Sequence, residues 1–152
     1  MSSDLETTSR RPMIALLNLA LASFSEELYR RIADSPFVDI RPGHGCVFGN
    51  IDTDGSRLTA IAERACMTKQ SVGEAVSDLE QRGYVERVPD PDDGRAKIIR
   101  LTARGRAAQS MGRVLIDDIE REWAERYGEE GVAALRETLE SVAAERLGAV
   151  PA

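Results

Sequence analysis

The chain has 152 residues, which is enough for one domain with its own hydrophobic core. Its formal net charge of −6 at pH 7 argues against nonspecific coating of nucleic acid, and its two cysteines are too few for a disulfide framework. The single histidine and the separated cysteines predict no metal site. Because the sequence has neither a long apolar run nor a signal-peptide core, we expect a cytoplasmic protein without a membrane span.

The N-terminal part predicts a tail followed by one long helix. Residues 1–11 are polar and partly acidic, so we expect a flexible tail there. Pro12 suits the first turn of a helix, and Pro36 marks its end. Between the two prolines, apolar residues recur at spacings of three and four, namely Ile14, Leu17, Leu21, Phe24 and Leu28. The pattern predicts an amphipathic helix within 12–36.

Residues 39–50 are the hardest to assign. Three glycines make the segment a poor helix by propensity, although Pro42 would still fit at a first helical position. His44 could bond a ligand or sense pH, but we favour a capping or packing role. Cys46 could sense oxidants only if exposed beside a cation; we favour a small buried side chain, and more strongly so for Cys66. The candidate ligand-binding residues are His44, Cys46 and Phe48.

Residues 56–83 have the pattern of two short helices with a tight break between them. The first helix carries an apolar stripe that Cys66 and Met67 interrupt. Thr68 can cap the second helix by accepting a hydrogen bond from a free backbone N–H, and Gly83 ends it. Taken alone, the pattern also fits a helical hairpin without a nucleic-acid role. The second helix leaves four outward positions for solvent or bases, namely Lys69, Gln70, Ser71 and Glu74.

A β-hairpin is predicted directly after these helices. The β-forming residues of 84–101 flank a turn at 89–94 that is rich in proline, aspartate and glycine. Arg95 suits a narrow minor groove, where the negative potential is deepest. Asp93 could hold the Arg95 guanidinium by a charge-assisted hydrogen bond, or the two could form a solvated ion pair of little energetic worth. The residues expected on phosphates are Arg57 and Lys97.

The C-terminal part predicts two further helices. Thr102 can cap a helix that begins near Ala103, and Gly128 breaks it. A last helix runs from about 129 to 147, and 148–152 form a tail. Both ends of the chain are thus long amphipathic helices, and one chain has little else against which their apolar faces could be buried. This favours two copies that interleave their terminal helices over a helical layer within a monomer.

The charges are unevenly distributed along the chain. Residues 57–106 contain 10 basic and 8 acidic residues, so their balance is +2, while the balance of the remainder is −8. Because DNA affinity rises with the number of phosphates neutralised, the local balance predicts moderate, salt-sensitive binding. The acidic remainder would keep the rest of the protein off the duplex.

Residues 56–105 resemble the MarR family of transcriptional regulators. The resemblance rests on the order and spacing of the motifs Leu-Thr-x-x-Ala-Glu-Arg, Thr-Lys-Gln-Ser-Val, Asp-Leu-Glu-Gln-Arg-Gly-Tyr-Val-Glu-Arg, Asp-Pro-Asp-Asp-Gly-Arg-Ala-Lys and Leu-Thr-Ala-Arg-Gly. It implies a mainly α (α+β) fold, with a winged helix-turn-helix at 37–101 and a helical dimerisation region at 12–36 and 102–147. It also implies an obligate homodimer on pseudo-palindromic DNA operators, released by a small ligand or an oxidant.

The chain departs from the family pattern in two places. Members commonly carry Ser or Thr followed by Arg where this chain has Gly73 and Glu74, so one expected DNA contact is lost. Glu74 could accept from a cytosine amino group, or it could face solvent away from the DNA, which we favour. In the hairpin the family's arginine pair is reduced to Gly94 and Arg95, which leaves a minor-groove arm with less charge.

We therefore expect a sequence-specific, DNA-binding transcriptional regulator, a homodimeric repressor that a small ligand relieves. The alternative is a winged-helix adaptor that binds proteins, which the acidic total slightly favours. We expect neither an enzyme nor a cofactor, because the sequence has no nucleophile–base–acid set and no phosphate loop. The expected DNA-binding residues are Arg57, Thr68, Lys69, Gln70, Ser71, Glu74, Asp93, Arg95 and Lys97.

Overall fold

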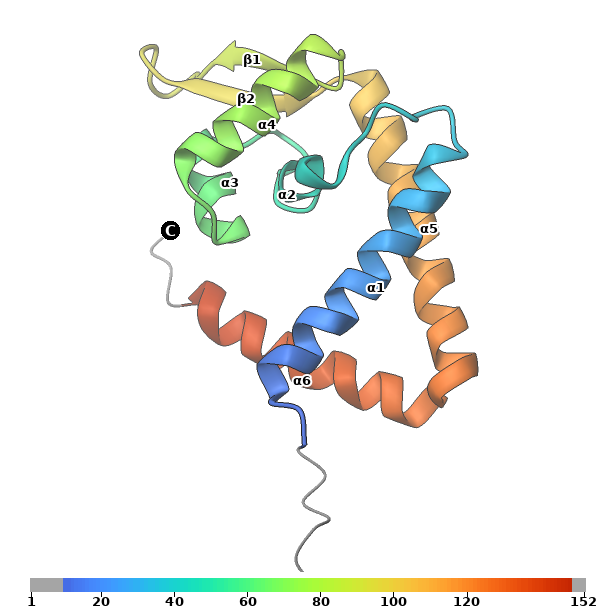
Figure 1. Ribbon diagram of the computed structural model, residues 1–152. Coiled ribbons are helices and arrows are strands. Elements are labelled where there is room, and N and C mark those ends of the chain that lie inside the picture. Colours follow the sequence, from blue (N-terminus) through green and yellow to red (C-terminus); the bar gives the residue numbers. More distant parts are fainter. Residues whose placement is uncertain (1–9, 149–152) are drawn as a thin grey trace, which may run out of the picture.

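Helices dominate the protein in the computed structural model, which describes residues 10–148 (Figure 1). The elements in chain order are α1 (Met13–Ala33), the 3-10 turn η1 (Pro42–His44), α2 (Gly45–Phe48), α3 (Leu58–Ala65), α4 (Lys69–Gln81), β1 (Val85–Pro89), β2 (Lys97–Leu101), α5 (Ala103–Tyr127) and α6 (Glu129–Gly148). The predicted fold class, mainly α with one small hairpin, is confirmed. The expected tails, 1–11 and 148–152, lie largely outside the described residues.

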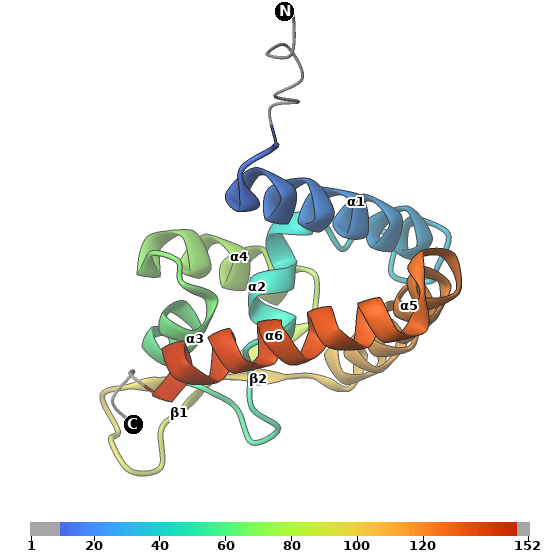
Figure 2. The ribbon, with the colours of Figure 1, turned by 90° about the horizontal axis from the view of Figure 1, so that it is seen from below.

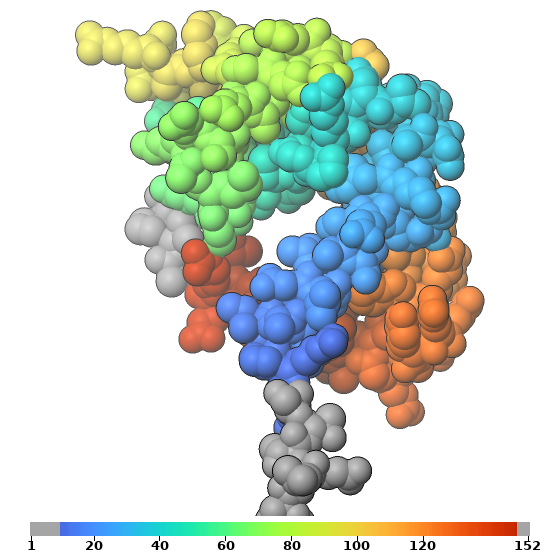
Figure 3. Space-filling model, in the orientation of Figure 1, coloured from blue at the N-terminus to red at the C-terminus, as the bar shows by residue number. Residues whose placement is uncertain are grey.

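The elements form two parts that α5 connects. The first part, here called the head (residues 42–101), contains η1, α2, α3, α4 and the hairpin. Helices α1 and α5 pack together below it, and α6 turns back from the far end of α5 towards α3 (Figures 1 and 2). An opening remains between the head, α1 and α6 (Figure 3). Each helix within 10–148 is too short or too polar to cross a bilayer.

The hydrophobic core lies in the head, where the apolar stripes of α3 and α4 meet the hairpin. Its most deeply buried members are Val47, Ile61, Val72, Val76, Leu79, Tyr84 and Ile99. Tyr84 supplies the largest of these side chains and packs edge-on against the rings of Phe37 and Phe48. Helical periodicity predicts Val72, Val76 and Leu79 as the inward residues of the second helix of the pair, and all three are buried.

Two threonines begin helices as predicted. The Thr68 hydroxyl oxygen accepts a hydrogen bond from the Ser71 backbone N–H at 3.1 Å, at the start of α4. The Thr102 hydroxyl oxygen does the same for the Gly105 N–H at the start of α5, also at 3.1 Å. Between α3 and α4, Cys66 takes a left-handed conformation with φ 55°, which makes the tight break. Cys66 is exposed, so the prediction that it is buried was wrong.

Large apolar side chains remain uncovered on the two terminal helices. On α1 they are Met13, Ile14, Leu16, Leu17, Leu19 and Leu21. On α6 they are Leu135, Leu139, Val142 and Leu147. Monomeric soluble proteins rarely expose contiguous apolar patches of this kind. A single chain, as described over 10–148, thus leaves these faces without a cover.

The start of α5 lies directly against the backbone at the end of α4. The Thr102 N–H donates to the Tyr84 carbonyl at 3.0 Å, and the Thr102 hydroxyl donates to the Gly83 carbonyl at 2.6 Å. Gly105 is buried there, and a Cβ atom at this position would come within 2.0 Å of the Tyr84 carbonyl oxygen. Only a residue without a side chain fits this contact.

Candidate nucleic-acid interface

The outward face of α4 is polar and exposed, as the sequence predicts for a recognition helix. Lys69, Gln70, Ser71 and Glu74 are all exposed. At the first turn, the Thr68 hydroxyl donates to the Ser71 hydroxyl at 3.0 Å, so these two side chains hold each other in place. Further along, the helix forms one wall of a groove that Gln70, Glu74, Ser77 and Gln81 line.

Arg87 of β1 lines the same groove, and sequence reasoning missed it. Its guanidinium donates to the Ser77 hydroxyl at 3.0 Å and lies 3.6 Å from a Glu80 carboxylate oxygen. The tight turn at Gly83 brings β1 back along α4, and that turn is the signal that could have placed Arg87 beside the recognition face. Arg87 thus places a guanidinium, paired with Glu80, on a face on which α4 itself offers only Lys69.

The hairpin is an antiparallel pair whose tip projects from the head (Figures 1 and 3). The register runs from Val85 opposite Leu101 to Pro89 opposite Lys97. Arg95 and Lys97 are exposed and make no ion pair within the described part of the chain. The Asp93 carboxylate accepts from the Arg95 backbone N–H at 3.1 Å, and neither alternative given for this pair, a bond to the Arg95 guanidinium or a solvated ion pair, is present. Asp93 therefore shapes the turn and leaves the Arg95 side chain free.

Arg57, expected on phosphate, is bonded to an acidic side chain of the head. Its Nε donates to the Asp90 carboxylate at 2.7 Å, and its Nη2 is bonded to the same oxygen. Asp90 is almost fully buried, and its other oxygen accepts from the Asp92 N–H at 2.9 Å. The Asp92 N–H and then the Arg57 guanidinium hold the pKa of Asp90 below its usual value. Arg57 thus fastens the start of α3 to the turn that follows β1, and its contact with phosphate stays a prediction.

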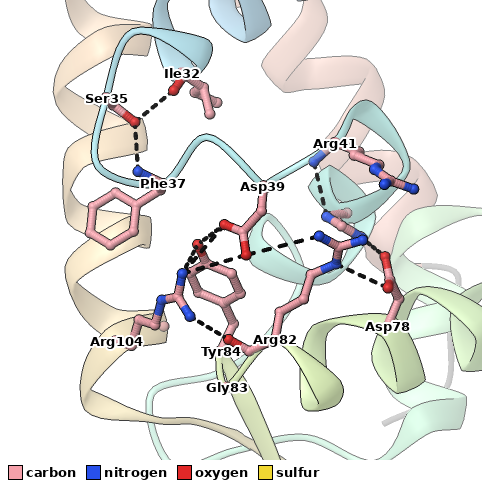
Figure 4. Close-up of polar contacts among 12 residues, drawn as sticks. Ile32, Ser35, Phe37, Asp39, Arg41, Asp78, Arg82, Gly83, Tyr84 and Arg104 are labelled. Atoms are coloured by element: carbon pink, nitrogen blue, oxygen red, sulfur yellow. Dashed lines mark hydrogen bonds and ion pairs between the residues drawn. The ribbon is translucent and has the colours of Figure 1, made fainter.

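A polar network joins the end of α4 to α5 and to the segment before η1 (Figure 4). The Tyr84 hydroxyl donates to Asp39, and the guanidinium groups of Arg104 and Arg82 lie 3.4 and 3.9 Å from Asp39 oxygens. Burial, and then the bond to Asp39, raise the pKa of Tyr84 to about 12, so its hydroxyl stays protonated at neutral pH. The bond from Tyr84 in turn lowers the pKa of Asp39. The network fixes the C-terminal end of α4 relative to α5.

His44 has a structural role in the head. It is buried, its Nδ1 accepts from the Arg41 backbone N–H at 3.0 Å, and its Nε2 therefore donates to Asp78 of α4 at 2.6 Å. Capping and packing, the role favoured for His44 from sequence, agrees with these contacts. Cys46 is half-buried, its thiol donates to the Gly43 carbonyl at 3.2 Å, and burial raises the pKa of that thiol. The side chains of His44 and Cys46 thus both make hydrogen bonds within the head.

A cavity of about 330 Å³ lies between α1, α2 and α5. Its lining is mostly apolar, with Leu28, Tyr29, Ile32, Phe48, Met111 and Ile116 among its members. Of the three candidate ligand-binding residues, only Phe48 lines it. Gln109 and Arg113 bring polar groups to its wall. Within 10–148, no cluster of three acidic, histidine or cysteine side chains is arranged to hold a metal ion.

These features define a winged helix-turn-helix protein: two helices with a tight break, and an antiparallel hairpin beside the second of them. Residues 39–96 match the model of the MarR family. Transcriptional regulator HosA of Escherichia coli O111:H- is 31% identical over 91 residues, which cover 59% of this chain and 67% of that protein. The chain belongs to the MarR family.

Two solved structures extend the likeness to most of the chain. The transcriptional repressor CouR bound to a 23-mer DNA duplex is 25% identical, with a TM-score of 0.74, over 87% of this chain and 92% of CouR. CouR from Rhodococcus jostii RHA1 bound to p-coumaroyl-CoA is 23% identical, with a TM-score of 0.71, over 86% of this chain and 92% of CouR. At these shares of the chain, the likeness extends well beyond the head.

Proposed function

We propose that this protein is a sequence-specific, DNA-binding transcriptional repressor that acts as a homodimer. The observation that carries the proposal is the pairing of an exposed polar face on α4 with the exposed Arg95 and Lys97 of the hairpin. A helix of this kind enters the major groove, and an arginine-bearing hairpin reaches the adjacent minor groove. CouR, a relative in fold and sequence, has been solved on a DNA duplex.

The dimerisation region proposed at 12–36 and 102–147 is supported by the uncovered apolar faces of α1 and α6. A second copy would bury these faces and hold its own α4 at a fixed distance from the first. Recognition helices in such dimers lie about one turn of DNA apart, roughly 34–36 Å, which makes a pseudo-palindromic operator the matching site.

Arg95→Ala tests the hairpin directly. We expect the variant to bind an operator at least about tenfold more weakly, with a shallower dependence on salt, because one cation per protomer leaves the minor groove. Gel-shift titrations at several salt concentrations measure both quantities. Arg126→Ala, which removes an equal charge from exposed α5, is the control and should bind like the wild type. Equal affinities for Arg95→Ala and wild type, at unchanged dimer mass, would remove the hairpin from the mechanism.

We also propose that a small organic effector occupies the cavity between α1, α2 and α5 and releases the DNA. CouR has been solved with p-coumaroyl-CoA, so a likeness of this fold to a ligand-binding protein supports the idea. Gly45 and Phe48 of α2 line the cavity, and the neighbouring His44 is bonded to Asp78 of α4. Because of that bond, an occupant that displaces α2 takes the recognition helix with it.

Gly112→Phe would imitate an occupant. Gly112 lines the cavity, and a Cβ atom there meets nothing within 4 Å, so a phenyl ring can enter the empty space. We expect about tenfold weaker operator binding, within the usual range of allosteric coupling, while Gly112→Ala leaves the cavity open and the affinity unchanged. Fluorescence anisotropy with a labelled duplex gives both affinities. A folded Gly112→Phe variant with full affinity would speak against release through this cavity.

The net charge of −6 favours one alternative, a winged-helix adaptor that binds another protein. Binding of genomic DNA fragments distinguishes the two. A regulator should lose affinity steeply as salt rises, because each phosphate contact releases counterions, whereas an adaptor should bind no duplex even at low salt.

A further inference from the structure

Glu74 is the one acidic side chain whose position on the recognition face calls for a partner outside the chain. It is exposed near the middle of α4, on the groove wall with Gln70 one turn before it and Ser77 one turn after it. In the described part of the chain, no hydrogen bond or ion pair engages its carboxylate. Gly73 adds no side chain beside it, so the carboxylate is accessible from the groove.

Asp78 in this groove and Glu80 on the same helix each have an arginine partner. Asp78 is bonded to His44 at 2.6 Å and to Arg82 at 3.0 Å. Glu80 lies 3.6 Å from the guanidinium of Arg87. A DNA duplex bound against this face of the protein would therefore meet one negative charge that has no partner, the carboxylate of Glu74. Such a charge weakens binding unless the DNA supplies a hydrogen-bond donor at that point.

The major groove offers donors on only two bases. Cytosine presents the N4 amino group, and adenine presents the N6 amino group beside the N7 acceptor, while guanine and thymine present acceptors. A carboxylate is acceptor-only, so the adjacent N7 of adenine repels it and cytosine suits it best. On these grounds, and resting on the proposed function, we propose that Glu74 reads a cytosine in each operator half-site, in place of the solvent-facing role that the sequence alone favoured.

This assignment gives Glu74 a role in specificity rather than in affinity. Facing cytosine, its carboxylate accepts a charge-assisted hydrogen bond. Facing guanine or thymine, it is desolvated against acceptors, and the complex is penalised. Lys97 attracts any duplex, because it acts on the phosphate backbone whatever the sequence, and Arg95 adds a contact in the minor groove. Glu74 then rejects the duplexes that lack the matching base, and Gln70, whose amide both donates and accepts, suits adenine.

The test selects binding sites from a random pool of duplexes with the full chain and with Glu74→Gln. We expect the wild-type sites to hold a C·G pair at one position of each half-site. Replacing that pair should weaken wild-type binding about 5- to 150-fold, the range for losing one base contact. Glu74→Gln should shift the same position to A·T, because its amide matches the donor and acceptor of adenine. Glu74→Ala should bind all four pairs within about twofold.

Glu63→Gln is the matched control. Glu63 is exposed on α3, outside the groove, and its substitution changes the net charge by the same amount. It should select the same sites as the wild type, which separates base reading from a general change in charge. If wild type and Glu74→Gln bind duplexes but select identical sites, the cytosine assignment is wrong, while the proposed function as a DNA-binding regulator still stands. If no protein binds any duplex at low salt, the proposed function fails, and the assignment fails with it.

Discussion

Gly105→Ala should lower the free energy of unfolding by about 3 kcal/mol or more, because the added methyl group has no space. Its Cβ would lie 2.0 Å from the Tyr84 carbonyl oxygen and 3.0 Å from the carbonyl carbon. These are backbone atoms, so no change of rotamer relieves the clash. Relief requires α5 to move away from the head, which breaks the Thr102 bonds to Gly83 and Tyr84. For a chain of this length the loss corresponds to a fall in Tm of roughly 6–12 °C.

Gly112→Ala is the matched control on the same helix. A Cβ atom there meets nothing within 4 Å, and alanine is about 1 kcal/mol better than glycine inside a helix. We therefore expect the two substitutions to shift stability in opposite directions in urea titrations followed by circular dichroism. A Gly105→Ala variant as stable as the wild type would show that α5 does not rest on the Tyr84 backbone as described.

Leu17→Glu combined with Leu21→Glu should split the proposed dimer. These leucines are 44% and 66% exposed on α1, one turn apart on the same face. In a symmetric dimer each substitution counts twice, so four buried leucines are replaced by charges. At about 1.5–3 kcal/mol for each of the four leucines, the loss is about 6 kcal/mol or more, so the dissociation constant of the dimer should rise by at least roughly 10⁴-fold. Sedimentation velocity at micromolar concentration measures this directly.

The same variant should bind operator DNA much more weakly, because two heads are no longer linked. Val38→Glu, placed on a residue 64% exposed between α1 and η1, is the control and should leave both the mass and the DNA affinity unchanged. The double variant should keep its helical content, since its side chains point away from the core of the head. A wild-type protein that sediments as a monomer would rule out the dimer itself.

Sequence predicts the head well where its determinants are local. The stripe of Val72, Val76 and Leu79 follows from helical periodicity, and it is the buried side of α4. The caps Thr68 and Thr102 act within three residues, so their hydroxyls find the N–H groups that the sequence indicates. In these elements, residues close together in the sequence are sufficient to determine the local conformation.

The candidate site is less predictable because its polar pairs are distant along the chain. Arg57 meets Asp90 33 residues later, and His44 meets Asp78 34 residues later. From sequence, a basic residue such as Arg57 in a DNA-binding unit is assigned to phosphate. Only the fold shows that the guanidinium of Arg57 is bonded to the carboxylate of Asp90. Arg87 is the converse case, since the return of β1 along α4 places it on the recognition face.

The junction between α5 and the head has a mechanical consequence. The Arg104 guanidinium donates to the Arg82 carbonyl at 2.6 Å, and the Gln109 amide donates to the Phe48 carbonyl at 2.9 Å, in addition to the bonds of Thr102. These hydrogen bonds hold the first two turns of α5 rigidly against the head, so there is no hinge at this end of the helix. In the proposed dimer, a change in the distance between the two heads would then require each α5 helix to tilt as a rigid rod about the contact between the terminal helices of the two copies.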